Sequence, residues 1–218
     1  MQLLRNGWLH RFQQLKGIGM DICVFVLKTR ENNTIDKSIE HFKQQGVTLK
    51  VIDNHKKSVL YGRTKAYEEC DNSFVSFIDD DDISLLTKDQ IARYIELNKK
   101  AMYTNSYKQT RLGKFPLTLV TLKEWSLRNG LSNKTKPHQS IIYDSSFAKD
   151  LVKRAGELIL KHSWSTNTCD YVMRALVSTE LGWHYEPDLT YVWDTNTSGL
   201  HLRQSMIYYD LKRYFFKV

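Results

Sequence analysis

The sequence lacks the features of a membrane protein or a disulfide-stabilised protein. Its apolar runs fall short of the roughly 18–20 residues that span a bilayer, and residues 1–19 have no continuous apolar centre of a secretion signal. The three cysteines lie far apart, form no CxxC pair and cannot all be paired within one chain. We therefore expect no transmembrane segment and a reducing compartment, the cytoplasm.

The sequence also lacks the spacing of a zinc site and any repetitive organisation. None of the seven histidines stands in an HxxxH or HxH pattern, so a zinc site is not expected. There is no internal repeat, low-complexity segment or clear linker. With 218 residues, of which 41% are hydrophobic and 26% charged, the chain has the composition of one soluble globular domain.

Charge is abundant and unevenly placed. The net charge is +8, and residues 108–154 contain ten Lys or Arg against three acids, whereas residues 79–82 are four consecutive aspartates. A basic surface attracts polyanions such as nucleic acid, nucleotides or anionic lipid. The alternative interpretation is a solvated, lysine-rich surface that keeps the protein soluble.

Strand and helix patterns alternate in the first eighty residues. Runs of β-branched and aromatic residues predict strands at residues 21–29, 47–54 and 73–78. Between them, the pattern predicts a helix from Thr34 to a stop at Gly46 and a short helix over residues 62–70. This order implies parallel pairing with right-handed crossovers, hence an α/β fold with a mostly parallel central sheet flanked by helices.

Further elements are predicted beyond residue 84. Thr87 and Gln90 have capping-box spacing at the start of a helix, and "TLKEWSLRNG" repeats this pattern. "HQSIIYD" and "LTYVWD" are predicted strands, and "SSFAKDLVKRAG" and residues 168–182 are predicted helices. The chain would end in an amphipathic segment.

The four aspartates follow the carboxyl end of a predicted central strand, where such sheets bind ligands. Carboxylates packed this closely repel one another unless a cation lies among them. Their oxygens suit Mg²⁺ or Mn²⁺, which leaves further positions to water and phosphate oxygens. A metal bound to a diphosphate stabilises the charge that grows on a departing nucleotide. The alternative is an acidic turn before a helix, in which Asp82 and its neighbours only cap that helix.

The segment "GRTKAYEECDNSFVSFIDDDD" resembles part of the GT-A glycosyltransferases of the family 2 type, in which a small helix leads into a strand that ends in an Asp-x-Asp motif. "VFVLKTR" is similar to that family's first strand and the turn after it, and "LKVIDN" to its second strand. "KPHQSIIYDSSF" resembles the acceptor-side strand, and "CDYVMRAL" resembles the helix whose leading acid is the catalytic base.

The resemblance covers roughly residues 20–200 and implies a single GT-A, Rossmann-like domain. It implies a nucleotide-sugar-binding half at residues 21–100 and an acceptor-binding half at residues 101–200. Residues 1–20 would form an amphipathic extension, and residues 201–218 an amphipathic helix. The implied activity is metal-dependent transfer of a sugar from a nucleotide-sugar donor to a hydroxyl group.

The resemblance also implies a donor site, in the first place for a UDP-sugar, formed by Thr29, Arg30, Asp53, Arg63, Asp79 and Asp80. Asp53 would accept a hydrogen bond from the base, Arg63 would lie near the base or the diphosphate, and Asp79 would contact the ribose. The proline and asparagine that are usual in the turn at Thr29 are missing here. For Asp53 the alternative is a turn residue, because Asp-Asn is also common turn chemistry.

Mn²⁺ or Mg²⁺ is the cofactor that the resemblance implies. Asp81 would be its first ligand, and His201 a third ligand, as a late histidine is in some GT-A enzymes. A run of four aspartates leaves the register open, so Asp80 and Asp82 are alternatives to their neighbours.

Asp170 stands at the start of a predicted helix and, by the resemblance, is the catalytic base of an inverting transfer. Such a base must lie within hydrogen-bond reach of the acceptor hydroxyl. The alternative is that Asp170 only complements the helix dipole. On the acceptor side, resemblance and charge indicate His138, Lys134 and Lys136 as binding residues, although a histidine beside a strand often satisfies a local hydrogen bond.

The identity of the acceptor stays open. The basic middle and the Lys-, Asn- and Tyr-rich character resemble proteins of large tailed phages, some of which glycosylate hydroxymethylated cytosine in their own DNA, in the host cytoplasm. A second hypothesis is synthesis of a surface polysaccharide, with residues 1–16 resting on the membrane. A nucleotidyltransferase ranks lower, because "LKTRENN" contains no glycine for a phosphate loop, and a DNA-binding module without catalysis is the fourth hypothesis.

Overall fold

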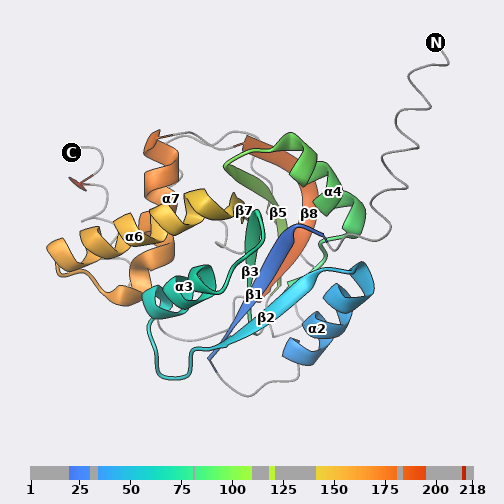
Figure 1. Cartoon of the computed structure of the whole chain (residues 1–218), viewed down its shortest axis with the longest axis horizontal. Coiled ribbons are helices and arrows are strands. Elements are labelled where there is room, and N and C mark those ends of the chain that lie inside the picture. Colours follow the sequence, from blue (N-terminus) through green and yellow to red (C-terminus); the bar gives the residue numbers. More distant parts are fainter. Residues whose placement is uncertain are drawn as a thin grey trace, which may run out of the picture.

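The computed structural model describes residues 20–29, 34–80, 82–109, 118–120, 141–180, 184–194 and 213–214. Its centre is an 8-stranded sheet with helices on both faces (Figure 1). The elements are β1 (Ile22–Lys28), α2 (Thr34–Gln45), β2 (Thr48–Asp53), α3 (Val59–Glu68), β3 (Phe74–Asp79), β4 (Ile83–Ser84), α4 (Lys88–Leu97), β5 (Ala101–Gln109), β6 (Thr118–Val120), β7 (Ile141–Asp144), α6 (Ser145–Lys161), the 3-10 helix η2 (Thr166–Thr168), α7 (Cys169–Glu180) and β8 (His184–Asp194). The predicted α/β fold class is confirmed.

The first three strands lie in the spatial order β2-β1-β3 and are parallel, as the sequence predicts. The register places Lys28 opposite Asp53 and Leu27 opposite Asp79. The carboxyl ends of these three strands therefore meet at one edge of the sheet, and the residues after each strand become neighbours.

The rest of the sheet is mixed. β7 pairs antiparallel with β3, β5 pairs antiparallel with β7, and β8 runs parallel to β5. The two-residue strand β4 pairs antiparallel with β8 and ends the order β2-β1-β3-β7-β5-β8-β4, while β6 pairs with β5 beside this path. Because β7 enters next to β3, the second half of the chain is built onto the strand that carries the aspartates.

The alternation of side chains along β1 forms two cores, one on each face of the sheet. Cys23, Phe25 and Leu27 pack with buried residues of α3, α6 and α7, whereas Val24 and Val26 pack with buried residues of α2 and α4. Successive side chains of a strand point to opposite faces, so a strand that is apolar at every position must be covered on both. Figure 1 shows the two helix groups on opposite sides of the sheet.

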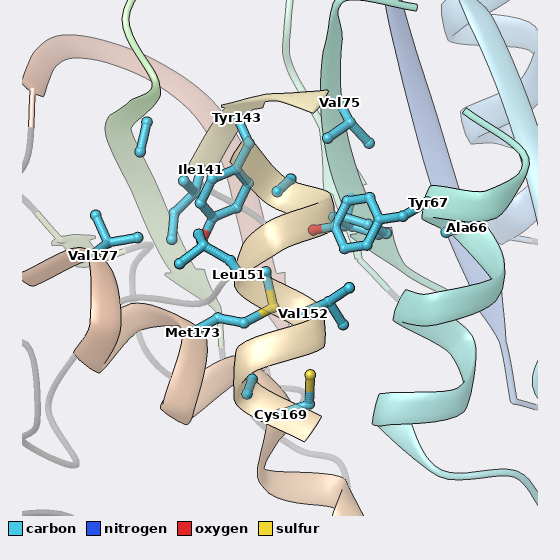
Figure 2. Close-up of a cluster of buried hydrophobic side chains, with 14 of the residues drawn as sticks. Ala66, Tyr67, Val75, Ile141, Tyr143, Leu151, Val152, Cys169, Met173 and Val177 are labelled. Atoms are coloured by element: carbon cyan, nitrogen blue, oxygen red, sulfur yellow. The ribbon is translucent and has the colours of Figure 1, made fainter. Parts of the chain in front are cut away.

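The core under α3, α6 and α7 contains polar aromatic side chains. Figure 2 shows Tyr67 of α3 and Tyr143 of β7 among aliphatic residues such as Leu151 and Val152 of α6. Both tyrosines are at most 1% exposed, and burial is the first cause that raises the pKa of each phenol above its ordinary value. They are therefore neutral at physiological pH.

The predicted helix boundaries are met in part. The capping box at α4 is present, with Gln90 N donating to Thr87 Oγ1 and Thr87 N donating to Gln90 Oε1, and Gly46 ends α2 with a φ of +68°. α3 begins at Val59, before the predicted residue 62, because Ser58 accepts a hydrogen bond from Tyr61 N and acts as the N-cap.

One alternative is corrected. Asp82 does not cap a helix, because β4 follows it and the next helix is capped by Thr87. Among the described residues, no helix is long and apolar enough to cross a membrane. The predicted helix in "TLKEWSLRNG" and residues 1–19 of the predicted extension lie outside the described residues, and the predicted domain boundaries stay predictions.

Candidate functional site

Polar side chains converge where β1, β2 and β3 end. Thr29 follows β1, Asp53 is the last residue of β2, and Asp79 is the last residue of β3, followed by Asp80. The parallel registers of these strands bring the three chain segments together. This edge of the sheet is the position at which the sequence predicts a donor site.

Asp80 connects the ends of β1 and β3. Its Oδ2 accepts two hydrogen bonds of 2.7 Å, from the backbone N and from Oγ1 of Thr29. The residue is only 4% exposed. Hydrogen bonds to an ionised acceptor are the strong kind, so Asp80 and Thr29 fix the geometry of the strand ends against each other.

A backbone hydrogen bond connects the first and the last of the four aspartates. Asp82 N donates to Asp79 O over 3.2 Å. Asp82 is 2% exposed, whereas Asp79 is half-buried at the strand end. Asp81 lies outside the described residues, and within the described part of the chain no group of three or more His, Cys, Asp or Glu could hold a metal ion.

The end of β2 carries an exposed acid and a buried amide. Asp53 is exposed, and its Oδ1 accepts a hydrogen bond from His55 N over 3.0 Å, which is the turn chemistry considered above. Its neighbour Asn54 is 3% exposed, and the side-chain Oδ1 is buried with no hydrogen-bond partner among the described residues. A buried acceptor without a partner costs about 1–3 kcal/mol, so Asn54 is a further candidate binding residue.

Asn54 was not predicted as a site residue from the sequence. The only indication of a binding residue at this position was the Asp-Asn pair, of which the acid, Asp53, was chosen. A strand points successive side chains to opposite sides, so at most one of two adjacent polar residues can face inward. Asn54 takes the inward position next to Gly62 of α3, where an added Cβ would lie 2.9 Å from Asn54 Oδ1 and 2.9 Å from Leu27 Cδ1.

Arg63 of α3 and Asp170 of α7 form a bidentate ion pair. Arg63 Nε donates to Asp170 Oδ1 and Arg63 Nη2 donates to Asp170 Oδ2, each over 2.8 Å. The Arg63 side chain is 1% exposed and that of Asp170 is 18% exposed. The two residues are 107 positions apart in the sequence. The pair therefore ties the helix before the aspartate strand to the helix that begins with the predicted base.

The surroundings keep Arg63 charged. Burial alone would lower the pKa of its guanidinium, but the attraction and hydrogen bonds of Asp170, together with the more distant charge of Asp79, raise that pKa well above its usual value. The Arg63 Cζ lies 3.9 Å from the centroid of the Phe77 ring, a cation–π contact. One guanidinium thus interacts electrostatically with both the strand-end Asp79 and the predicted base.

The remaining predicted site residues cannot be placed, because they lie outside the described residues: Arg30, Asp81, Lys134, Lys136, His138 and His201. For these residues the roles given above stay predictions.

No known family model matches this sequence, and no curated protein is detectably similar to it. Solved structures are similar in fold. S. aureus TarS 1–349 in complex with UDP-GlcNAc superposes with a TM-score of 0.51 at 15% identity over 95% of this chain and 60% of that one. S. aureus TarS gives a TM-score of 0.50 at 14% identity, over 95% of this chain and 36% of that one.

Mannosyltransferase PcManGT from Pyrobaculum calidifontis, in complex with GDP-Man and Mn²⁺, is 13% identical over 92% of this chain and 67% of that one, but its TM-score of 0.47 is too low to support an argument. The chain spans about three-fifths of the TarS 1–349 chain. TarS and PcManGT are GT-A glycosyltransferases. The likeness to TarS shows that the described fold is that of the GT-A glycosyltransferases, as predicted.

Proposed function

We propose that this protein is a glycosyltransferase that moves a sugar from a nucleotide-sugar donor to a hydroxyl group of an acceptor. The observation that carries the proposal is the position of Arg63, which binds Asp170 and also interacts with the charge of Asp79. The bidentate pair connects α3, the helix before the predicted donor-binding strand, to the predicted base. The GT-A fold supports the same assignment, because the neighbour TarS was solved with UDP-GlcNAc.

The proposed transfer is a single displacement with Asp170 as the general base. The acceptor hydroxyl attacks the anomeric carbon of the donor, and a new carbon–oxygen bond forms as the bond between that carbon and the diphosphate oxygen breaks. The hydroxyl proton passes to the Asp170 carboxylate, and the bonding electrons leave with the nucleoside diphosphate. Such a displacement inverts the anomeric centre. Asp170 is 18% exposed, which leaves part of the carboxylate accessible to a hydroxyl.

We further propose that Mn²⁺ or Mg²⁺ assists the transfer. The residues at the end of β3 fit such an ion, because Asp79 presents a half-buried carboxylate there and Asp81, the predicted ligand, follows it two residues later. When bound, the ion would stabilise the negative charge on the leaving diphosphate. Thr29 and Asp80 would keep the strand ends at a fixed separation for it.

A donor-binding and turnover experiment tests the proposal. UDP-GlcNAc, other UDP-sugars and GDP-sugars are titrated into the purified protein with Mn²⁺, and binding is followed by calorimetry. Release of nucleoside diphosphate is then measured with water as the acceptor. We expect a subset of donors to bind and to be hydrolysed slowly. If none of them binds with or without the metal, the proposal is wrong.

For the acceptor, DNA is the first hypothesis and a surface polysaccharide the second. DNA is favoured by the ten basic residues among residues 108–154, of which the structure describes Lys108 in β5 and those from residue 141 onward. Lys149 and Lys153 are exposed on α6. A base in duplex DNA would have to leave the stack before its hydroxyl could reach Asp170.

A further inference from the structure

The Arg63 guanidinium is buried, and two of its three nitrogens pair with Asp170, whereas Nη1 is buried without a hydrogen-bond partner among the described residues. Nε and Nη2 bind the two oxygens of Asp170, and one face lies over the Phe77 ring. The residue is 1% exposed. A contact with a nucleotide base or diphosphate, as predicted from the sequence, needs guanidinium hydrogens that a ligand can reach. In the described geometry such a ligand has little access to the buried Arg63.

We propose that Arg63 is a positioning residue for Asp170, and that its planar fork holds the carboxylate in the orientation needed to take a proton from the acceptor. This inference rests on the proposed function and deepens it. A carboxylate has about four lone-pair sites, and the pair with Arg63 occupies two of them. The Asp170 side chain is 18% exposed, whereas that of Arg63 is 1% exposed.

The fork restricts the rotation of the carboxylate. Two parallel hydrogen bonds of equal length place both oxygens in the guanidinium plane, which a single contact would not do. Arg63 is itself immobilised by burial and by the stacked Phe77. A base that is held in its reactive orientation before the substrate arrives avoids an entropic cost in the transition state.

Asp170 lies in a polar cluster contributed by α3, β7, α7 and the end of β3. Its charged and titratable members are Arg63, Tyr67, Asp79, Tyr143, Cys169 and Arg174. Burial, as the first cause, raises the pKa of the two phenols and of the Cys169 thiol, so these three groups stay neutral between pH 5 and 8. The positive charge next to Asp170 is thus not cancelled by a neighbouring thiolate or phenolate.

Two substitutions separate the charge of Arg63 from its shape. Arg63→Lys keeps the charge but removes the fork, so we expect kcat to fall about 10- to 100-fold with little change in the acidic limb of the pH–rate profile. Arg63→Gln removes the charge as well. Without the adjacent cation the protonated form of Asp170 is favoured, so the acidic limb should move up by about 1–3 pH units.

The experiment measures donor affinity, kcat and KM from pH 4.5 to 8.5, with the donor that best stabilises the wild-type protein, UDP-GlcNAc being tried first. Lys65→Gln is the matched control, because Lys65 lies on the same helix in an exposed pair with Glu68, and it should leave the affinity, the rate and the pH profile unchanged. If Arg63→Gln does not fold, Arg63→Lys alone tests the positioning role, because its effect on kcat can be compared with its effect on donor affinity.

The outcomes distinguish the roles. Donor affinity that falls tenfold or more in Arg63→Lys at unchanged kcat would assign Arg63 to donor binding and overturn the positioning role. Unchanged kcat together with unchanged affinity would make the pair merely structural, which overturns it equally. A wild-type protein that binds no nucleotide sugar instead contradicts the proposed function, and the positioning role with it.

Discussion

Gly62 lies at the candidate site and has no room for a side chain. An added Cβ would lie 2.9 Å from both Asn54 Oδ1 and Leu27 Cδ1, a distance at which real Cβ contacts essentially never occur. Asn54 and Leu27 are themselves buried, so neither can move away easily. Glycine is therefore needed here because α3 approaches the ends of β1 and β2 closely.

We predict that Gly62→Ala lowers the free energy of unfolding by about 1–3 kcal/mol, because overpacking forces the neighbouring atoms to shift. Gly156→Ala is the matched control. Gly156 lies within α6, and a Cβ there would make an ordinary contact at 3.5 Å from Leu60 Cδ1. The control should stabilise by roughly 0.5–1 kcal/mol. Urea unfolding measures the free energy of unfolding of both variants. Equal changes in the two variants would contradict the close approach of α3 to the ends of β1 and β2.

Asp170→Asn is the direct test of the predicted base. The amide cannot take the acceptor proton, so turnover should fall about 10²- to 10⁴-fold while the donor still binds. Because the amide pairs less well with the buried Arg63, the variant must first be shown to be folded, for example by circular dichroism. Full turnover would point to another base or to a retaining mechanism.

At the scale of the element, the helices α4 and α6 have different roles in the fold. α4 begins with a capping box and holds β8 through Asp188, which accepts a 2.5 Å hydrogen bond from Tyr94 Oη and pairs with Arg93. α6 covers the core beside α3 and α7 and exposes lysines to solvent. The first helix stabilises the mixed half of the sheet, and the second offers a basic surface.

We predict that Thr87→Ala destabilises the protein by about 0.5–2 kcal/mol, because it removes the hydroxyl that accepts from Gln90 N. Thr87→Ser keeps that hydroxyl and should lose much less stability. Thermal or urea unfolding compares the two variants. If serine and alanine destabilise equally, the loss comes from the methyl group and the capping role is wrong.

Lys153→Glu on α6 tests the DNA hypothesis. Reversing the charge of an exposed lysine that contacts phosphate weakens binding to all DNA sequences. It also lowers the number of counterions released on binding, read from the salt dependence of the affinity, by about one or more. Lys37→Glu is the control, since Lys37 is exposed on α2, which covers the opposite face of the sheet. Fluorescence anisotropy over a salt series measures the salt dependence of DNA binding by both variants. An equal slope in both variants would assign the α6 lysines to solubility.

At the scale of the whole molecule, the donor would bind where the two halves of the sheet join. The parallel strands β2, β1 and β3 lie on one side of this junction, and the antiparallel neighbour β7 leads into α6 and α7 on the other. A ligand that contacts the end of β3 and Asp170 connects elements from both halves. Binding of such a ligand should therefore raise the free energy of unfolding of the protein.

We predict that a donor at one hundred times its Kd raises the free energy of unfolding by about 2.7 kcal/mol in the presence of Mn²⁺. Chelation with EDTA should remove most of this stabilisation and should leave the protein without donor unaffected. Thermal shift with and without EDTA measures both effects. A donor that stabilises equally after chelation would argue against a metal at the aspartates.

The sequence predicted the local patterns correctly, and the reason can be seen in particular residues. The apolar run of β1, the helix stop at Gly46 and the capping box at Thr87 depend on neighbours within a few positions, so their signals are present in the sequence. α2 shows the limit of this reasoning. Ile39 lies at helical spacing from Ile35 and Phe42, an apolar pattern that favours burial, yet it is 39% exposed, whereas Ser38 beside it is buried.

The contacts of the site depended on the tertiary structure. Arg63 and Asp170 were selected separately, one for the donor and one for the base, and nothing in the sequence between these two residues, which are 107 positions apart, indicates that they pair. Asp80 was predicted to bind the donor, and its hydrogen bonds to Thr29 exist because β1 and β3 are parallel neighbours in one register. Asn54 was missed because its buried position depends on how closely α3 approaches it at Gly62.

The sequence by itself determined the order of the first three strands and the helices between them, the acidic end of β3 and the acid at the start of α7, because periodicity, capping and charge are local properties of the chain. It did not predict the strands β4, β5 and β6. Only the tertiary structure decided which of these groups meet. The packing of α3 against α7 brought Arg63 and Asp170 together. Such contacts follow from the burial of whole faces, which no short stretch of sequence encodes.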